Sequence, residues 1–248
     1  MGRKYKNPPL VEVVCEIRFT PETEWKPILP GLLFPKVEGN FPTTKEDRPS
    51  RIQITPREEG GVTSKITTEK FTVFYAEDEK TLFRIGPRIL AIHRLKPYPK
   101  WEEFKPTIGV ISSALFETIG DIDGIQRLGL RYVNHIFINE ESPELSRYFK
   151  IGPALGDELP AGFSNFLVGC TFPFNGGRYA CRLHFSSLAI REPEKKGFLL
   201  DIDYFLNEPK TVEPAGIIEW VEEGHKRVEE IFEGSITDEL RKIFGEVK

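Results

Sequence analysis

The sequence lacks three features that would assign the protein to a class at once: a long apolar run, a set of paired cysteines and an excess of positive charge. A membrane-spanning helix needs about 20 consecutive apolar residues, so we expect no membrane partner. The opening residues lead into a strand rather than into the apolar core of a signal peptide, which predicts a cytoplasmic protein. The net charge of −4 gives no general attraction to nucleic acid, so any such binding must be local.

The three cysteines, Cys15, Cys170 and Cys181, are odd in number and lack the spacing of a zinc site. Each is in phase with apolar neighbours at the period-two spacing of a strand. We therefore predict reduced, buried thiols, and we expect neither a metal nor a cofactor.

What the sequence does contain is strand-like alternation in a chain of ordinary globular composition. Leu10 to Phe19 places apolar side chains on one face and mostly charged ones on the other. Arg127 to Ile138 does the same near the middle of the chain. Because these two strands each open a similar order of elements, we predict that residue 125 begins a second unit.

In the first unit, 1–124, the strand is followed by short helical turns within 22–39 and a polar connector at 41–49. Four strands then come at 51–56, 70–77, 81–85 and 88–95, with Gly60-Gly61 between two of them. A helix follows from Trp101 to Ile119, in which Pro106 is tolerable only in the first turn.

In the second unit, 125–248, the strand is followed by a short helix near 142–150 and by strands near 163–174, 178–190 and 197–206. A long helix starts around Pro214, and a short one follows from Ile236 to Phe244, with Ser235 or Thr237 available as a cap. The predicted fold is α+β, with two tandem units of strand, helix, antiparallel sheet and helix. Both long helices would back a sheet that is continuous or divided between the units.

Three stretches are distinctive: NPPLVE at 7–12, GLRYVN at 129–134, and the FxxxIT run from Phe232 to Thr237. Together they resemble a sporadically distributed family of uncharacterised prokaryotic proteins of similar length. The resemblance implies kinship of fold over nearly the whole chain, and it implies no chemistry.

The polar sides of the two opening strands form the first candidate site. Glu12, Glu16 and Arg18 lie in one half, and Arg127, Arg131 and His135 in the other. If a pseudo-dyad makes the strands neighbours, their opposite charges face each other across the ladder. We predict an interface or an ion-pair network from Glu12, Glu16, Arg131 and His135.

A second candidate lies in the hairpin that turns at 191–196. Counting back from the turn places His184 opposite Asp203 and Ser186 opposite Asp201, all on one face. A hydrolase would need a strained elbow or an oxyanion donor, and the sequence offers neither around Ser186.

A metal-dependent phosphohydrolase of the triphosphate-tunnel type is an alternative, since Glu16-Ile17-Arg18 is similar to the first strand of that group. Val14 departs from the pattern, because a carboxylate should stand there. Magnesium or manganese would need oxygen ligands from converging strands. If the protein is an enzyme, the residues that we expect to carry the chemistry are Glu16, Arg18, Arg131, His184, Asp201 and Asp203.

For nucleic acid, the densest basic stretch is interleaved with aromatic residues, a composition that suits phosphate neutralisation and base stacking. Its members are Arg84, Arg88, Arg94, Lys96 and Lys100. The duplicated element order is also similar to the saddle of the TATA-binding protein, although Glu12 and Glu16 would place carboxylates inside such a saddle. His225, flanked by Glu222, Glu223 and Lys226, is predicted at the solvent edge of its helix.

The sequence thus favours a non-enzymatic interaction or regulatory module that binds another macromolecule, with a protein as the expected partner. The sporadic distribution of the family that it resembles suggests a role in a bacterial stress or defence cassette. The alternatives are a saddle-like nucleic-acid-binding protein and the phosphohydrolase. Convergence in one enclosed pocket of at least four of six residues would favour catalysis, and their spread over an open surface would favour binding. The six are Glu12, Glu16, Arg131, His184, Asp201 and Asp203.

Overall fold

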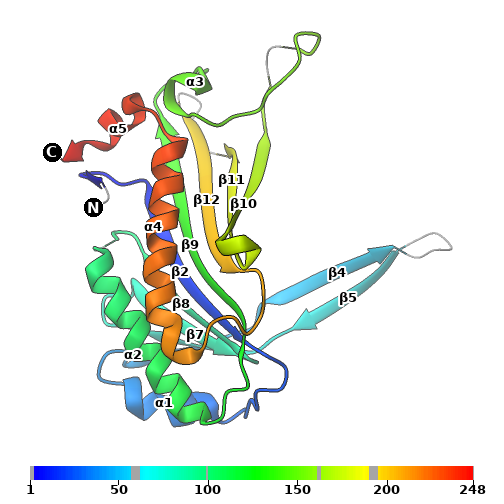
Figure 1. Cartoon of the computed structure of the whole chain (residues 1–248), viewed down its shortest axis with the longest axis vertical. Coiled ribbons are helices and arrows are strands. Elements are labelled where there is room, and N and C mark those ends of the chain that lie inside the picture. Colours follow the sequence, from blue (N-terminus) through cyan, green and yellow to red (C-terminus); the bar gives the residue numbers. More distant parts are fainter. Residues whose placement is uncertain (1–2, 57–61, 99, 161–162, 190–194, 248) are drawn as a thin grey trace.

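The computed structural model describes residues 3–56, 62–98, 100–160, 163–189 and 195–247. Strands from both halves of the chain form one nine-stranded antiparallel sheet in the order β10-β11-β12-β9-β2-β8-β7-β6-β3. Figure 1 shows the helices α2 and α4 against one face of this sheet. The α+β class is therefore confirmed.

The two strands that the sequence singled out lie side by side in the middle of the sheet. β2 (Leu10–Phe19) pairs antiparallel with β9 (Ile125–Ile138). Beyond β2 follow β8 (Ile89–Leu95), β7 (Thr81–Gly86), β6 (Phe71–Tyr75) and β3 (Thr43–Asp47). Beyond β9 follow β12 (Lys196–Leu206), β11 (Tyr179–Leu188) and β10 (Leu167–Phe174).

The core lies between the sheet and the helices α1 (Leu29–Val37), α2 (Trp101–Ile119) and α4 (Ile217–Ser235). Val13, Cys15 and Ile17 are fully buried on the helix side of β2. Because side chains alternate along a strand, the residues between them face the opposite side of the sheet. No helix covers that side in Figure 1. No helix in the described part of the chain is long and apolar enough to span a bilayer.

Smaller elements surround this frame. They are the helices α3 (Leu145–Tyr148) and α5 (Asp238–Phe244), the 3-10 turns η1 (Asn175–Gly177) and η2 (Pro214–Gly216), and the paired strands β1 (Lys4–Tyr5) and β13 (Glu246–Val247). A separate hairpin of β4 (Ser50–Pro56) and β5 (Val62–Thr68) projects from the body of the molecule (Figure 1).

Several local predictions were wrong. Residues 43–47 form the edge strand β3 rather than a connector. Their polar side chains show no strand pattern, but their backbone pairs with β6. β5 was missed, and the predicted turn at Gly60-Gly61 lies outside the described residues, as does most of the turn at 191–196. Pro106 lies inside α2, beyond its first turn.

Two further corrections concern single side chains. Cys170 is exposed, because its strand β10 is at the edge of the sheet, while Cys15 and Cys181 are buried as predicted. Burial raises the pKa of each of the two buried thiols to about 12. Thr237 occupies the N-cap position of α5 without capping it, and its hydroxyl instead donates to the carbonyls of Arg147 and Tyr148.

Candidate functional site

The candidate site is the side of the sheet opposite the helices, where acidic and basic groups from β2, β9, β12 and β11 meet. We call it the charged face. It consists of Glu12, Glu16, Arg18, Arg127, Arg131, Arg182, Asp201 and Asp203. The pairing of β2 with β9 makes the two opening strands neighbours, and Glu16 lies 2.9 Å from Arg127 across them. Glu12 pairs with His93 and Arg131 with Asp201, rather than with each other as predicted.

The strongest contacts on the charged face are made by arginines of β9. Arg131 Nε and Nη2 donate to the two oxygens of Asp201, both at 2.7 Å. Arg127 Nη2 donates to Asp203 at 2.8 and 3.1 Å, while its Nη1 donates to Glu16 at 2.9 Å. Such two-pronged, charge-assisted bonds fix the plane of the guanidinium as well as its position.

Flanking strands extend the network. Arg182 on β11 donates to Asp203 at 2.8 Å, and Arg18 Nε donates to Glu16 at 2.8 Å. Burial raises the pKa of the Glu16 carboxyl, but the hydrogen bond from Arg18 and the charges of Arg127 and Arg18 outweigh this and hold the pKa below its ordinary value. The Glu16 carboxylate is therefore held in its ionised form by arginine.

Glu12 has a different partner, which the sequence did not reveal. Its carboxylate lies 2.8 Å from Nδ1 of His93 on β8, and this hydrogen bond lowers the pKa of Glu12 in spite of burial. His93 was missed because its distance from Glu12 along the chain gives no sign that β8 returns beside β2. Arg182 was missed too, although it is in phase with His184, which we did single out.

Exposure divides the charged face into two levels. The side chains of Asp203, Asp201 and Glu16 are 5%, 9% and 19% exposed. Those of Arg131, Arg182 and Arg18 are 51%, 46% and 40% exposed. Arg127 and Glu12, at 25% and 32%, lie between the two groups. At Asp201 and Asp203 the carboxylates thus lie near the sheet, beneath the more exposed guanidinium groups of Arg131 and Arg182.

Aromatic side chains lie on the same side of the sheet. The guanidinium carbons of Arg127 and Arg182 lie 5.6 and 5.5 Å from the ring centre of Phe205. Phe137, on β9, is exposed. His135 is on the same side of β9, and its backbone N–H donates to the carbonyl of Pro9 at 3.0 Å.

The predicted hydrolase register is wrong by two residues. His184 pairs with Asp201, Arg182 with Asp203, and Ser186 with Leu199. A shift of two residues keeps each side chain on its predicted face, because the side-chain period of a strand is two. Ser186 nevertheless loses the acidic neighbour that the hypothesis gave it.

The six residues proposed for an enzyme lie on one face of the sheet, and none of them lines the cavity described below. Glu16, Arg131, Asp201 and Asp203 are all in ion pairs. Among the described residues, no group of three or more His, Cys, Asp and Glu side chains is arranged to hold a metal ion. The carboxylates that would coordinate magnesium are committed to arginine.

The basic stretch is not brought together. Arg84 is on the same side of the sheet as Ala91 and Glu16. Its guanidinium carbon lies 5.4 Å from the ring centre of Phe71. Arg94 is on the helix side of β8, where it pairs with Asp78. Arg88 lies in the β7–β8 turn and donates to the carbonyl of Thr23 at 3.3 Å. Lys96 and Lys100 are exposed beyond the end of β8.

His225 lies between the helices and the sheet, so its predicted position at the solvent edge is wrong. Its ring stacks on Trp101 with centroids 4.3 Å apart, and Nδ1 lies 2.8 Å from the hydroxyl of Tyr132. Burial lowers the pKa of His225 to about 4, against the charges of nearby glutamates. The packing of α4 on α2 determines this position, which the flanking charges did not reveal.

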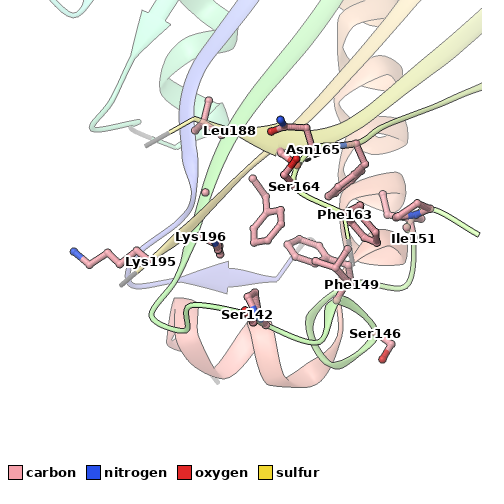
Figure 2. A pocket seen from close by; sticks show the side chains of 18 of the residues that line it. Ser142, Ser146, Phe149, Ile151, Phe163, Ser164, Asn165, Leu188, Lys195 and Lys196 are labelled. Atoms are coloured by element: carbon pink, nitrogen blue, oxygen red, sulfur yellow. Dashed lines mark hydrogen bonds between the residues drawn. The ribbon is translucent and has the colours of Figure 1, made fainter. Parts of the chain in front are cut away.

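A cavity with a volume of about 1020 Å³ lies near α3 and the ends of β11 and β12. Its apolar lining comes from Phe149, Phe163, Phe166 and Phe198. Figure 2 shows Phe149, Phe163 and Ser164 around this space. No residue of the charged face lines it, so the predicted site residues and the cavity are separate features.

No family model matches the chain, and no curated protein or solved structure matches it either.

Proposed function

We propose that this protein is a non-enzymatic module that binds another macromolecule through its charged face. The observation that carries the proposal is the two-level arrangement of the ions, with buried carboxylates beneath half-exposed arginines. An arginine held by two of its five N–H groups still offers the others to a partner. The carboxylates hold the arginines in place before binding, which reduces the side-chain entropy lost on binding.

The partner that fits this surface best is a protein with an acidic patch. Arginine and aromatic residues are enriched at protein interfaces, and Phe137 and Phe205 lie on the same side of the sheet as the arginines. Acidic side chains of a partner would find N–H donors without displacing the internal ion pairs.

We further propose that the chain consists of two related units, 1–124 and 125–248. The strand order in one half is β2-β8-β7-β6, with β3 added beyond β6, and in the other half it is β9-β12-β11-β10. A long helix follows each set along the chain. On this proposal a pseudo-dyad between β2 and β9 generates the charged face from both copies, as in a saddle. Kinship with the sporadically distributed prokaryotic family, a cytoplasmic location and a role in a stress or defence cassette are proposed from the sequence resemblance alone.

Affinity capture from nuclease-treated lysate of the native host tests the proposal. Three baits are compared: wild type, Arg131→Gln/Arg182→Gln, and the control Arg3→Gln/Arg147→Gln. The two control arginines are 48% and 53% exposed and are also ion-paired with glutamates, so both double variants lose two equally exposed positive charges. Thermal melting of each bait checks that it is folded.

We expect one set of proteins on the wild type and on the control that is missing from the charged-face variant and is released by salt. Equal retention by all three baits would place binding elsewhere on the molecule. Failure of the folded wild type to retain anything at low salt would remove the proposal.

Nucleic acid is a second candidate, because the same exposed guanidinium groups could neutralise phosphates and Phe137 could stack on a base. Fluorescence anisotropy with a labelled single-stranded oligonucleotide tests it. Support would be binding that weakens steeply with salt and is lost in Arg131→Gln/Arg182→Gln and in Arg84→Gln. Absence of binding at low salt would exclude this candidate and leave the protein partner.

A further inference from the structure

The two edges of the nine-stranded sheet differ in kind. At one edge, β3 has the sequence TTKED and every residue is exposed. Charged side chains on an edge strand prevent pairing with another chain. At the other edge, β10 has the sequence LVGCTFPF, without a single charge. Among the described residues, one edge strand is thus protected by charge, while β10 pairs with β11 alone and carries no charge. We call the outer side of β10 the open edge.

Several exposed apolar side chains lie on β10 or shortly before it in the sequence. Leu167 and Phe172 of β10 are 71% and 40% exposed. Three more exposed apolar side chains, Leu155, Leu159 and Phe163, precede the strand. In Figure 1, β10 lies at the outer edge of the sheet, away from α2 and α4.

The pairing of β10 with β11 determines which backbone groups point outward. The N–H of Ser187 donates to the carbonyl of Phe166 at 3.2 Å, which makes residue 166 an inward-bonded position. The register continues without a shift through Phe174. Bonding positions alternate along a strand, so the outward positions of β10 are Leu167, Gly169, Thr171 and Pro173.

We propose that two copies of this chain pair antiparallel through β10, about a two-fold axis at Cys170. This register engages all four outward positions: Gly169 opposes Thr171, and Leu167 opposes Pro173 of the second copy. It sets Val168 against Phe172, an aromatic and β-branched pair of the kind that stabilises sheets. Because β10 contains no charged residue, pairing with a second copy of the same strand brings no like charges together. Pro173 has no backbone N–H, so the ladder lacks one hydrogen bond at each of its two ends.

The register makes Cys170 of one copy face Cys170 of the other in a non-hydrogen-bonded pair. Cα atoms of such a pair are about 4.5 Å apart, within the range that a disulfide spans. Because Cys15 and Cys181 are buried, mild oxidation with copper–phenanthroline should give a covalent dimer on a non-reducing gel. Cys170→Ser should give none while remaining dimeric in sedimentation.

Charge exchange at residue 170 is the decisive test, followed by sedimentation velocity across the micromolar range. Cys170→Lys and Cys170→Glu, each alone, should be monomeric because identical charges would face each other across the axis. Mixed in equal amounts, they should form a heterodimer. The control Thr44→Lys, on the charged edge strand β3, should dimerise like wild type.

A wild type that stays monomeric throughout this range would overturn the proposal. So would Cys170→Lys chains that dimerise as well as wild type, or a mixture that does not associate. The proposal is independent of what the charged face binds, since β10 contributes no residue to that face.

Discussion

At the scale of single residues, the charged face depends on a few carboxylates, of which Glu16 and Asp203 each pair with two arginines. Asp203 is the least exposed of them, and it accepts hydrogen bonds from both Arg127 and Arg182. Removal of one partner from a buried ion pair costs more than the pair contributes, because the remaining charge is left without compensation.

Asp203→Ala should therefore lower the free energy of unfolding by about 2 kcal/mol, less than for a fully buried pair because both arginines reach solvent. Urea denaturation followed by circular dichroism measures the change. Glu24→Ala, which breaks an exposed pair with Lys26, should change the free energy by less than about 0.5 kcal/mol. Equal effects of the two substitutions would mean that the network contributes little to stability.

His225 gives a pH dependence with a definite sign. Its pKa is lowered by burial to about 4 from an ordinary value of 6.5, so between these values the unfolded chain is protonated at this site and the folded chain is not. Acid therefore favours the unfolded state, and stability should fall as the pH drops from about 6.5 to about 4. The melting temperature of His225→Gln, recorded over the same range, should fall less steeply. Parallel curves for the two proteins would show that the folded imidazole has an ordinary pKa.

At the scale of elements, α4 contains two glycines with different surroundings, Gly224 inside the helix and Gly234 in its last turn. A Cβ at Gly224 would lie 2.8 Å from Cδ1 of Tyr204, whereas nothing lies within 4 Å of one at Gly234. Alanine is favoured over glycine in a helix by about 1 kcal/mol. The space around each glycine therefore decides whether its replacement by alanine raises or lowers the stability of the protein.

Gly224→Ala should destabilise the protein by about 1–2 kcal/mol, because overpacking against a buried ring outweighs the gain in helix propensity. Gly234→Ala should leave stability unchanged or raise it by up to about 1 kcal/mol. Thermal unfolding of the two variants compares them directly. Stabilisation of both would mean that α4 can move away from β12 without cost.

The same elements show what the sequence could and could not predict. The alternation of Leu10–Phe19 and the apolar stripe of α2 predicted both elements, because each has one buried face. β3 was missed, since all of its side chains are exposed and only its backbone is paired. The β11–β12 register was placed two residues away, because alternation determines the face of a side chain but not its partner.

At the scale of the whole molecule, the sheet separates two kinds of surface. Helices bury one side and make the core, while the other side collects arginines from β2, β9 and β11. The sequence predicted that the charges of β2 and β9 would meet, because the two strands were interpreted as the opening strands of two similar units. It could not predict the two levels of the charged face, since exposure depends on how each side chain lies on the sheet.

Arginine labelling with phenylglyoxal, read residue by residue by mass spectrometry, tests most directly whether a partner covers the charged face. Labelling in nuclease-treated host lysate is compared with labelling in buffer. We predict that Arg131 and Arg182 react more slowly in lysate, while Arg3 and Arg147, which are equally exposed, react at the same rate in both. Unchanged labelling of Arg131 and Arg182, or equal protection of all four arginines, would contradict the account.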